Sequence, residues 1–277
     1  MTTGDAAGSR NAGAMNRYVA LGSSMAAGPG IAPRATGSPR RAMRSERNYP
    51  HLVAARLGLD LIDVTYSGAT TAHILRQPQH GSAPQIDALD GSERLVTITI
   101  GGNDVGYVPL LFAATLPAIL RRVPVIGPAL RVLLDPAARE WALNEVATSL
   151  NEVGAAVRGR CPRARVMFVD YLTLLPPAGI PAPPLSEPIA DLARHVAARL
   201  EDLTATAARE TGCEIVAASH ASRDHHAWSG APWTIGAGPF LPGRPKPFHP
   251  NAEGMSAVAD LVVARVGGRG TGEGDGH

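Results

Sequence analysis

Four residues have types and neighbours that suit them to catalysis: Ser24, Gly68, Asn103 and His249. A serine flanked by small residues can be approached closely by a substrate, and a glycine in a turn lets its backbone N–H face a ligand. An asparagine that follows paired glycines can present its amide to a developing oxyanion. A histidine held between an aromatic residue and a proline has a fixed backbone and can serve as a general base.

Each of these residues also has a purely structural interpretation. The serine would be a helix N-cap and the glycine an ordinary turn residue. Asn103 would belong to a Gly-Asn turn in which Asp104 caps the next segment, and His249 would be one structural histidine among nine. Taken singly, none of them establishes a function, so their order along the chain and the elements that carry them decide the interpretation.

Strand-like and helix-like segments alternate between residues 17 and 266. Apolar runs rich in β-branched residues predict buried strands, and helical spacing that stops at glycine predicts helices. Because helices separate the strands, we expect parallel pairing with right-handed crossovers. The fold class is therefore α/β: a three-layer α/β/α sandwich with a mostly parallel five-stranded sheet, flavodoxin-like in type. The predicted strands are Arg17–Gly22, Leu61–Tyr66, Leu95–Ile100, Arg165–Asp170 and Glu214–Ala218, and the predicted helices are Tyr49–Leu57, Pro136–Val157, Pro188–Thr211 and Ala252–Val266.

The predicted elements would gather the four residues at one edge of the sheet. In such sheets the ligand-binding residues lie on loops that leave the carboxyl ends of the strands. Ser24, Gly68 and Asn103 follow the first, second and third predicted strands, and His249 shortly precedes the last predicted helix. We therefore expect them to lie together.

This series resembles the SGNH (GDSL) hydrolase family of esterases and lipases, and the resemblance covers the chain from Tyr18 to Val266. It implies that Ser24 is the nucleophile and His249 the base. It also implies that the Ser24 backbone N–H, Gly68 and Asn103 form the oxyanion hole. More narrowly, three segments look like the actinobacterial branch of secreted esterases: Ala218-Ser219, His225 to Trp233, and Phe248 to Asn251.

Two positions depart from the family pattern. The aspartate that usually precedes the nucleophile is Ser23 here, and the acid expected three residues before the histidine is Lys246. A lysine side chain cannot stabilise an imidazolium, because both carry positive charge. Some family members use a main-chain carbonyl from this position, so the Lys246 backbone oxygen is the first candidate to orient His249. The second candidate is the Asp224 carboxylate.

Composition excludes several other classes of protein. The chain has 277 residues with a formal net charge of +2, which is too balanced to predict nucleic-acid binding. Lys246 is the only lysine and lies in a proline-rich loop, which argues against a catalytic Schiff base and a phosphate-binding Gly-Lys loop. The apolar run Tyr107–Leu120 contains two prolines and is too short to span a bilayer. Residues 1–16 contain no apolar stretch typical of a signal peptide, so we expect a cytoplasmic protein without stable membrane insertion.

The chain is expected to form one hydrolase domain, residues 17–266, between disordered tails at 1–16 and 267–277. Its two cysteines, Cys161 and Cys213, would be separate thiols or one disulfide. The sequence leaves the oligomeric state open.

Three further patterns bear on other kinds of site. No Gly-x-Ser-x-Gly elbow occurs, which excludes the α/β-hydrolase interpretation. A cluster of histidines and an aspartate lacks the spacing of a metal site, so no metal is expected. A basic stretch would be a solvated loop or a contact for an anionic substrate group. The cluster of histidines and an aspartate consists of His220, Asp224, His225 and His226. The basic stretch contains Arg34, Arg40, Arg41, Arg44 and Arg47.

The expected function is that of a serine ester hydrolase that forms an acyl-enzyme on Ser24 and needs no cofactor. Its substrate would be a small-molecule or lipid ester, and the apolar segment Tyr107–Leu134 would line an acyl pocket or act as a lid. Two alternatives remain open. One is acyl transfer to another alcohol at the same site, and the other is a catalytically weak binding protein that kept the fold.

Overall fold

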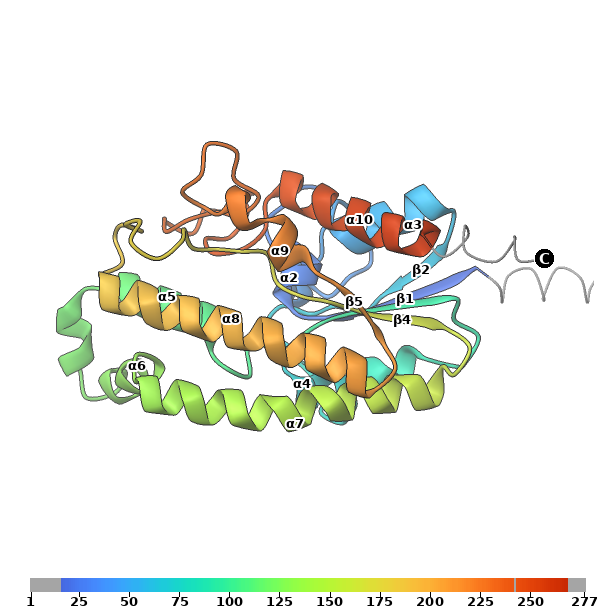
Figure 1. Ribbon diagram of the computed structural model, residues 1–277, viewed down its shortest axis with the longest axis horizontal. Helices are drawn as coiled ribbons and strands as arrows, with labels where there is room; N and C mark the ends of the chain where they lie inside the picture. Colours follow the sequence, from blue (N-terminus) through green and yellow to red (C-terminus); the bar gives the residue numbers. More distant parts are fainter. Residues whose placement is uncertain (1–15, 242, 269–277) are drawn as a thin grey trace, which may run out of the picture.

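The computed structural model describes residues 16–241 and 243–268, which form a sheet between two layers of helices (Figure 1). The five strands lie in the order β2-β1-β3-β4-β5, and every neighbouring pair is parallel. This arrangement confirms the predicted α/β class and five-stranded sheet. The strands are β1 (Arg17–Gly22), β2 (Asp60–Asp63), β3 (Leu95–Thr99), β4 (Arg165–Val169) and β5 (Glu214–Val216).

Helices cover both faces of the sheet. Helices α3 and α10 pack against each other on one face, and α7 packs against α4 and α8 on the other (Figure 1). The α-helices are α2 (Ser24–Ala27), α3 (Tyr49–Leu57), α4 (Thr71–Leu75), α5 (Tyr107–Thr115), α6 (Gly127–Leu133), α7 (Pro136–Arg160), α8 (Glu187–Glu210), α9 (Ala218–Ala221) and α10 (Ala252–Gly267). Four 3₁₀ turns complete the described elements: η1 (Arg40–Ala42), η2 (Gln85–Ala88), η3 (Ala118–Arg122) and η4 (Arg223–His225).

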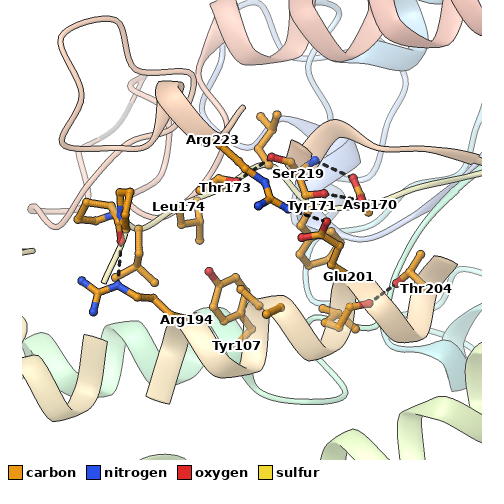
Figure 2. A pocket seen from close by; sticks show the side chains of 17 residues that line it. Tyr107, Asp170, Tyr171, Thr173, Leu174, Arg194, Glu201, Thr204, Ser219 and Arg223 are labelled. Carbon is orange, nitrogen blue, oxygen red and sulfur yellow. Dashed lines mark hydrogen bonds and ion pairs between the residues drawn. The ribbon is translucent and has the colours of Figure 1, made fainter. Parts of the chain in front are cut away.

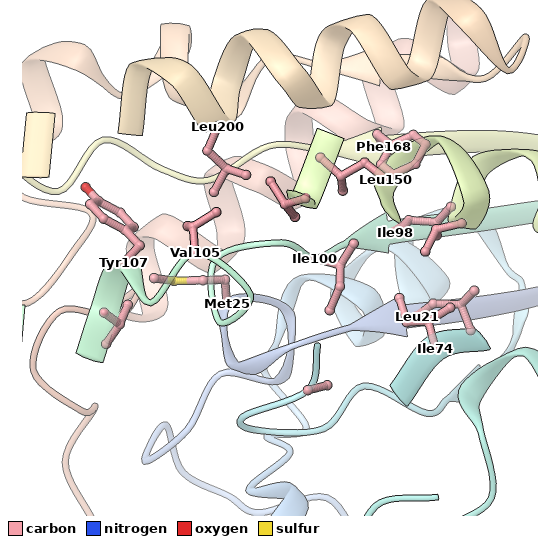
Figure 3. Packing of buried hydrophobic residues seen from close by; sticks show 14 of the residues in the cluster. Leu21, Met25, Ile74, Ile98, Ile100, Val105, Tyr107, Leu150, Phe168 and Leu200 are labelled. Carbon is pink, nitrogen blue, oxygen red and sulfur yellow. The ribbon is translucent and has the colours of Figure 1, made fainter. Parts of the chain in front are cut away.

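The alternation of side chains along β1 accounts for the two cores. Tyr18 and Ala20 belong to the apolar cluster under α3 and α10, whereas Val19 and Leu21 belong to the cluster under α7 and α8. Successive side chains of a strand point to opposite faces, so a strand that is apolar throughout must be covered on both sides. Figure 3 shows part of the second cluster, in which Leu21 of β1 lies beside Ile74 of α4; Ile98 of β3 and Leu150 of α7 belong to the same cluster.

The second strand is shorter than predicted. It ends at Asp63 rather than Tyr66, although the Val64 and Tyr66 N–H groups still donate to the carbonyls of Ala20 and Gly22 in β1. The Asp63 carboxylate accepts hydrogen bonds from the backbone N–H and the hydroxyl of Thr65, at 2.9 and 2.6 Å. The chain then enters the loop that carries Gly68.

The two cysteines are separate thiols in this structure. The Cys161 thiol is buried and donates to the Glu93 carboxylate at 2.9 Å, and burial raises its pKa to about 12. The expected tails lie outside the described residues, apart from Asn16, Gly267 and Gly268. Within the described ranges, no helix combines the length and the apolar content needed to cross a membrane.

Candidate active site

Ser24 and His249 form a hydrogen-bonded pair at the carboxyl end of β1. The Ser24 hydroxyl lies 2.9 Å from Nε2 of His249, although 225 positions separate the two residues in the chain. Ser24 is the first residue of α2, which follows β1 after the single residue Ser23. His249 lies just before α10, whose N-cap is Asn251. The structure therefore brings together the predicted nucleophile and the predicted base.

The other ring nitrogen of His249 contacts the backbone carbonyl of Pro247 at 2.8 Å. A carbonyl only accepts, so Nδ1 must carry the proton and donate it to Pro247. In the neutral imidazole Nε2 is then unprotonated and accepts the Ser24 hydroxyl hydrogen, which is the tautomer that a general base requires. The Lys246 carbonyl was expected in this role, and the structure corrects this expectation by one residue.

A strained residue accounts for the use of Pro247. Phe248 has a φ of 57°, in the left-handed region that bulky residues rarely adopt, and this conformation turns the preceding carbonyl back toward the ring of the next residue. Packing holds the conformation, because the Phe248 ring is fully buried and meets Phe112 of α5 edge-to-face at 5.3 Å. Backbone bonds to Ile235 flank the same loop: Phe248 N–H donates to Ile235 O, and Ile235 N–H donates to His249 O.

Burial controls the protonation of His249. It lowers the pKa of His249 to about 4, against the effect of the hydrogen bond to Pro247, and the nearby Lys246 ammonium lowers it further. Both causes disfavour the imidazolium. In the resting protein the imidazole is therefore neutral at pH 7, ready to accept a proton.

Two backbone N–H groups beside the dyad have no hydrogen-bond partner within the described residues, those of Ser24 and Gly68. Gly68 has a φ of +81° and is exposed at the loop surface. The Asn103 amide donates to the carbonyl of Ala69 at 2.8 Å, which places it against the residue that follows Gly68 and leaves its second N–H hydrogen for a ligand. The predicted oxyanion donors thus lie on adjoining loops.

Two side chains that the sequence did not single out as site residues hold these loops in place. Asp104 accepts from the Thr71 backbone N–H at 3.0 Å and from its hydroxyl at 2.6 Å, which ties the Asn103 loop to α4, just after Gly68. Gln85 makes a pair of bonds with Gly22, donating to its carbonyl and accepting from its N–H. The two oxyanion loops are therefore tied to each other, and the end of β1 is tied to η2.

Tyr171, two positions after the end of β4, supports the same region. Its hydroxyl lies 3.1 Å from the hydroxyl of Ser23 and accepts from the Gly102 backbone N–H at 2.9 Å. A Cβ at Gly102 would overlap the Tyr171 ring, so any residue larger than glycine would have to displace that ring. Ser23, which replaces the aspartate of the family pattern, thus takes part in a tyrosine contact beside the nucleophile.

The remaining predicted candidates lie apart from the dyad. Asp224 is exposed in η4, and Nδ1 of His249 is bound by the Pro247 carbonyl rather than by the Asp224 carboxylate, so the structure does not support Asp224 as the orienting residue. His225 stacks on Trp233, with ring centroids 4.0 Å apart, and contacts the Ala231 carbonyl at 2.7 Å. Among the described residues, no group of three or more His, Cys, Asp or Glu side chains has the arrangement to hold a metal ion.

A cavity of about 270 Å³ lies beyond Tyr171, between the loop after β4 and helix α8 (Figure 2). Most of its charged groups bind one another or the backbone: Arg223 pairs with Glu201 at 3.3 Å, and Arg194 donates to the Pro176 carbonyl. Its wall includes Tyr107, whose buried hydroxyl has no partner within the described residues. Ser24 and His249 do not line this cavity, whereas Tyr171 does, and the Tyr171 hydroxyl contacts Ser23, the neighbour of Ser24.

Asp170 forms a further buried contact in this wall. It accepts from the Ser219 hydroxyl at 2.6 Å and from the Ser219 backbone N–H at 2.8 Å, and burial raises the pKa of Asp170 to about 6. This contact joins the end of β4 to α9.

Comparison with known proteins places the chain in a family. Residues 20–257 match the GDSL-like Lipase/Acylhydrolase family. The chain is 35% identical to Lipase 2 of Streptomyces coelicolor over 256 residues, which span 90% of this chain and 85% of that protein. The crystal structure of an extracellular lipase from Streptomyces rimosus matches with a TM-score of 0.73 at 28% identity, over 91% of this chain and 99% of that one.

A second solved structure has the same fold. Phospholipase A1 from Streptomyces albidoflavus NA297 gives a TM-score of 0.70 at 24% identity and covers the same shares of the two chains. The relatives are lipases, which are carboxylic ester hydrolases, and they agree with the resemblance drawn from the sequence. The chain therefore belongs to the GDSL-like Lipase/Acylhydrolase family.

Proposed function

We propose that the protein hydrolyses carboxylic esters through an acyl-enzyme on Ser24. The observation that carries this proposal is the 2.9 Å contact between the Ser24 hydroxyl and His249 Nε2, in a tautomer fixed by Pro247. Nucleophile and base lie within hydrogen-bond reach, and a third group orients the base, as nucleophilic catalysis requires.

In the first half-reaction, Nε2 of His249 accepts the hydroxyl proton as Ser24 attacks the acyl carbonyl. The carbonyl oxygen becomes negative and receives hydrogen bonds from the N–H groups of Ser24 and Gly68 and from the Asn103 amide. His249 then gives the proton to the departing alcohol oxygen, which breaks the ester bond. The products of this half-reaction are the free alcohol and an acyl group on Ser24.

In the second half-reaction, water replaces the alcohol. His249 accepts a proton from water, the resulting oxygen attacks the acyl carbonyl, and the proton returns to Ser24 as the acid is released. Every group in these steps belongs to the described chain, the ester or water. The Pro247 carbonyl orients the ring throughout, and being neutral it stabilises the imidazolium less than a carboxylate would.

Steady-state kinetics on 4-nitrophenyl esters of increasing acyl length test the proposal. We expect wild-type hydrolysis and a loss of kcat of at least about 10³-fold in both Ser24→Ala and His249→Ala, with no larger loss in the double variant, because the two residues act as one unit. A double variant much worse than either single one would contradict the dyad.

The same assay separates the two alternatives. Acyl transfer would produce a new ester when a second alcohol is added, at the expense of the free acid, and a weak binding protein would release no 4-nitrophenol above the level of Ser24→Ala. The cytoplasmic location stays a prediction, to be checked by fractionation of the producing cells.

A further inference from the structure

A groove of about 260 Å³ opens beside the dyad, and we call it the cationic groove. It is lined by five basic side chains, by apolar residues that include Ile31, Met43 and Phe240, and by no carboxylate among the described residues. The basic residues are Arg34, Arg40, Arg44, Arg244 and Lys246.

The backbone places this groove next to the catalytic residues. One wall begins at Gly30, three positions after the end of α2, and the other ends at Lys246, three positions before His249. The Lys246 N–H joins the two walls by donating to the Pro29 carbonyl at 3.1 Å. Gly30 lies against the Arg244 carbonyl so closely that a Cβ would overlap it. The oxyanion loop adjoins the groove as well, because the Ser67 N–H donates to the Ala42 carbonyl at 3.1 Å.

Within the described residues, four of the five cations lack a carboxylate partner. The fifth, Arg44, donates to the Thr65 carbonyl and lies 3.9 Å from Asp63. Arg34 donates to the Ser38 carbonyl, and the Lys246 ammonium lies 5.0 Å from the centre of the Phe240 ring. The side chains of Arg40 and Arg244 make no hydrogen bond or ion pair within the part of the chain that the structure describes.

Unpaired like charges around one groove repel one another and raise the local positive potential. An anion in the groove would relieve that repulsion, and guanidinium groups match the paired oxygens of phosphate and carboxylate. Resting on the proposed ester hydrolysis, we propose that the cationic groove binds an anionic group, phosphate or carboxylate, that is part of the ester substrate. The apolar walls then contact the carbon atoms between that group and the ester.

Substrate pairs and a matched charge control test this proposal. Phenyl butanoate is compared with its para-phosphate and para-carboxylate derivatives in the wild type, in R40Q/R244Q and in R41Q/R47Q. The control pair removes the same charge from exposed arginines of the neighbouring segment that do not line the groove. All variants are first checked for folding by circular dichroism.

We expect R40Q/R244Q to lower kcat/KM for the anionic esters by about tenfold or more and for the neutral ester by less than about twofold, since lost charge-assisted hydrogen bonds affect only the anion. The control should stay within about twofold for all three esters. Added sodium chloride should reduce the wild-type preference for the anionic esters. An unchanged preference in R40Q/R244Q, or an equal loss in the control, would overturn the proposal.

Calorimetric binding of phenyl phosphate gives a readout that does not depend on catalysis. The wild type and the control should bind it, and R40Q/R244Q should bind it at least about tenfold more weakly. Inorganic phosphate binding as tightly as phenyl phosphate would show a site for a free anion and contradict a substrate subsite. If the wild type hydrolyses none of the esters but binds phenyl phosphate as expected, ester hydrolysis fails while the groove stands. If the wild type hydrolyses the neutral and anionic esters equally well, the proposed role of the cationic groove is contradicted while ester hydrolysis stands.

Discussion

Ser23 and Ser24 are adjacent and both buried, yet their hydroxyls have different partners. The Ser24 hydroxyl meets Nε2 of His249, whereas that of Ser23 meets the Tyr171 hydroxyl. Only Ser24 therefore has a base within reach. The difference follows from the turn between β1 and α2, which points two neighbouring side chains to different elements.

The use of a backbone carbonyl predicts how the site responds to loss of side chains. Lys246→Ala and Asp224→Asn should each leave kcat on a neutral ester within about threefold, because Nδ1 of His249 is bound by the Pro247 carbonyl, which survives both changes. Steady-state kinetics on a 4-nitrophenyl ester give the comparison. A loss near 10⁴-fold in Asp224→Asn, the size given for the triad aspartate of serine proteases, would make the Asp224 carboxylate the orienting group.

The burial of His249 sets the acid limit of activity. Its pKa of about 4 lies below the ordinary 6.5, so the neutral base persists as pH falls through 6 and is lost only as pH approaches 4. As pH falls, His249 is protonated near pH 6.5 in the unfolded chain but only near pH 4 in the folded protein. Between these values protonation favours the unfolded chain, so the contribution of His249 to the free energy of unfolding is complete above pH 6.5 and declines as pH falls toward 4. A pH profile of kcat/KM measures the first effect, and a midpoint near 6.5 would contradict it.

At the scale of elements, local patterns predict what local contacts determine. β1 was predicted to the residue because an apolar run ends at Gly22, and α3 because its helical spacing ends at Gly58. The braces of the site were not predictable in this way. Tyr171 contacts Ser23 across 148 positions and Gln85 contacts Gly22 across 63, and neither residue lies in a motif that marks such a contact.

The carbonyl that orients His249 could not be predicted from the local sequence either. The family pattern pointed to Lys246, but the positive φ of Phe248 brings the carbonyl of Pro247 to the ring. That conformation depends on burial of the Phe248 side chain against Phe112, a contact between distant segments. The reaction class and the dyad could be read from motif order, whereas the details of support required tertiary structure.

The contact of Gly102 with Tyr171 gives an element-scale prediction. Gly102→Ala should lower the free energy of unfolding by about 1–3 kcal/mol, because the new methyl group must displace the Tyr171 ring and its bonds to the Ser23 and Gly102 loops. Urea unfolding measures the change. Gly159→Ala is the matched control, since Gly159 lies in α7 with open space around it and alanine should stabilise that helix by up to about 1 kcal/mol. Equal stability of the two variants would show that Tyr171 moves freely.

Across the whole molecule, the active site and the hydrogen bonds that attach α10 to the sheet lie at opposite ends of the sheet. Arg165 at the start of β4 donates to the carbonyls of Val266 and Arg265 at the end of α10. It also makes two bonds with Glu214 of β5, at 2.9 and 2.8 Å. One guanidinium thus joins two strands to the helix whose other end begins just after His249.

Removing this guanidinium should affect stability rather than chemistry. Arg165→Met should lower the free energy of unfolding by about 2 kcal/mol, since hydrogen bonds between charged groups and helix-end carbonyls are lost. Arg163→Met, an exposed position two residues away, should change it by less than about 0.5 kcal/mol. Thermal and urea unfolding report both. We expect the kcat of Arg165→Met, measured at a temperature well below its unfolding transition, to equal that of the wild type. A lower kcat under these conditions would show that Arg165 affects the active site as well as stability.

Covalent trapping tests the assignment of Ser24 most directly. The protein is treated with a fluorophosphonate, and the adduct is located by mass spectrometry of the intact chain and of its peptides. We expect one adduct, on Ser24, that is absent in Ser24→Ala, formed much more slowly in His249→Ala and retained in Ser23→Ala. An adduct on another residue, or labelling of Ser24→Ala at the wild-type rate, would contradict Ser24 as the nucleophile.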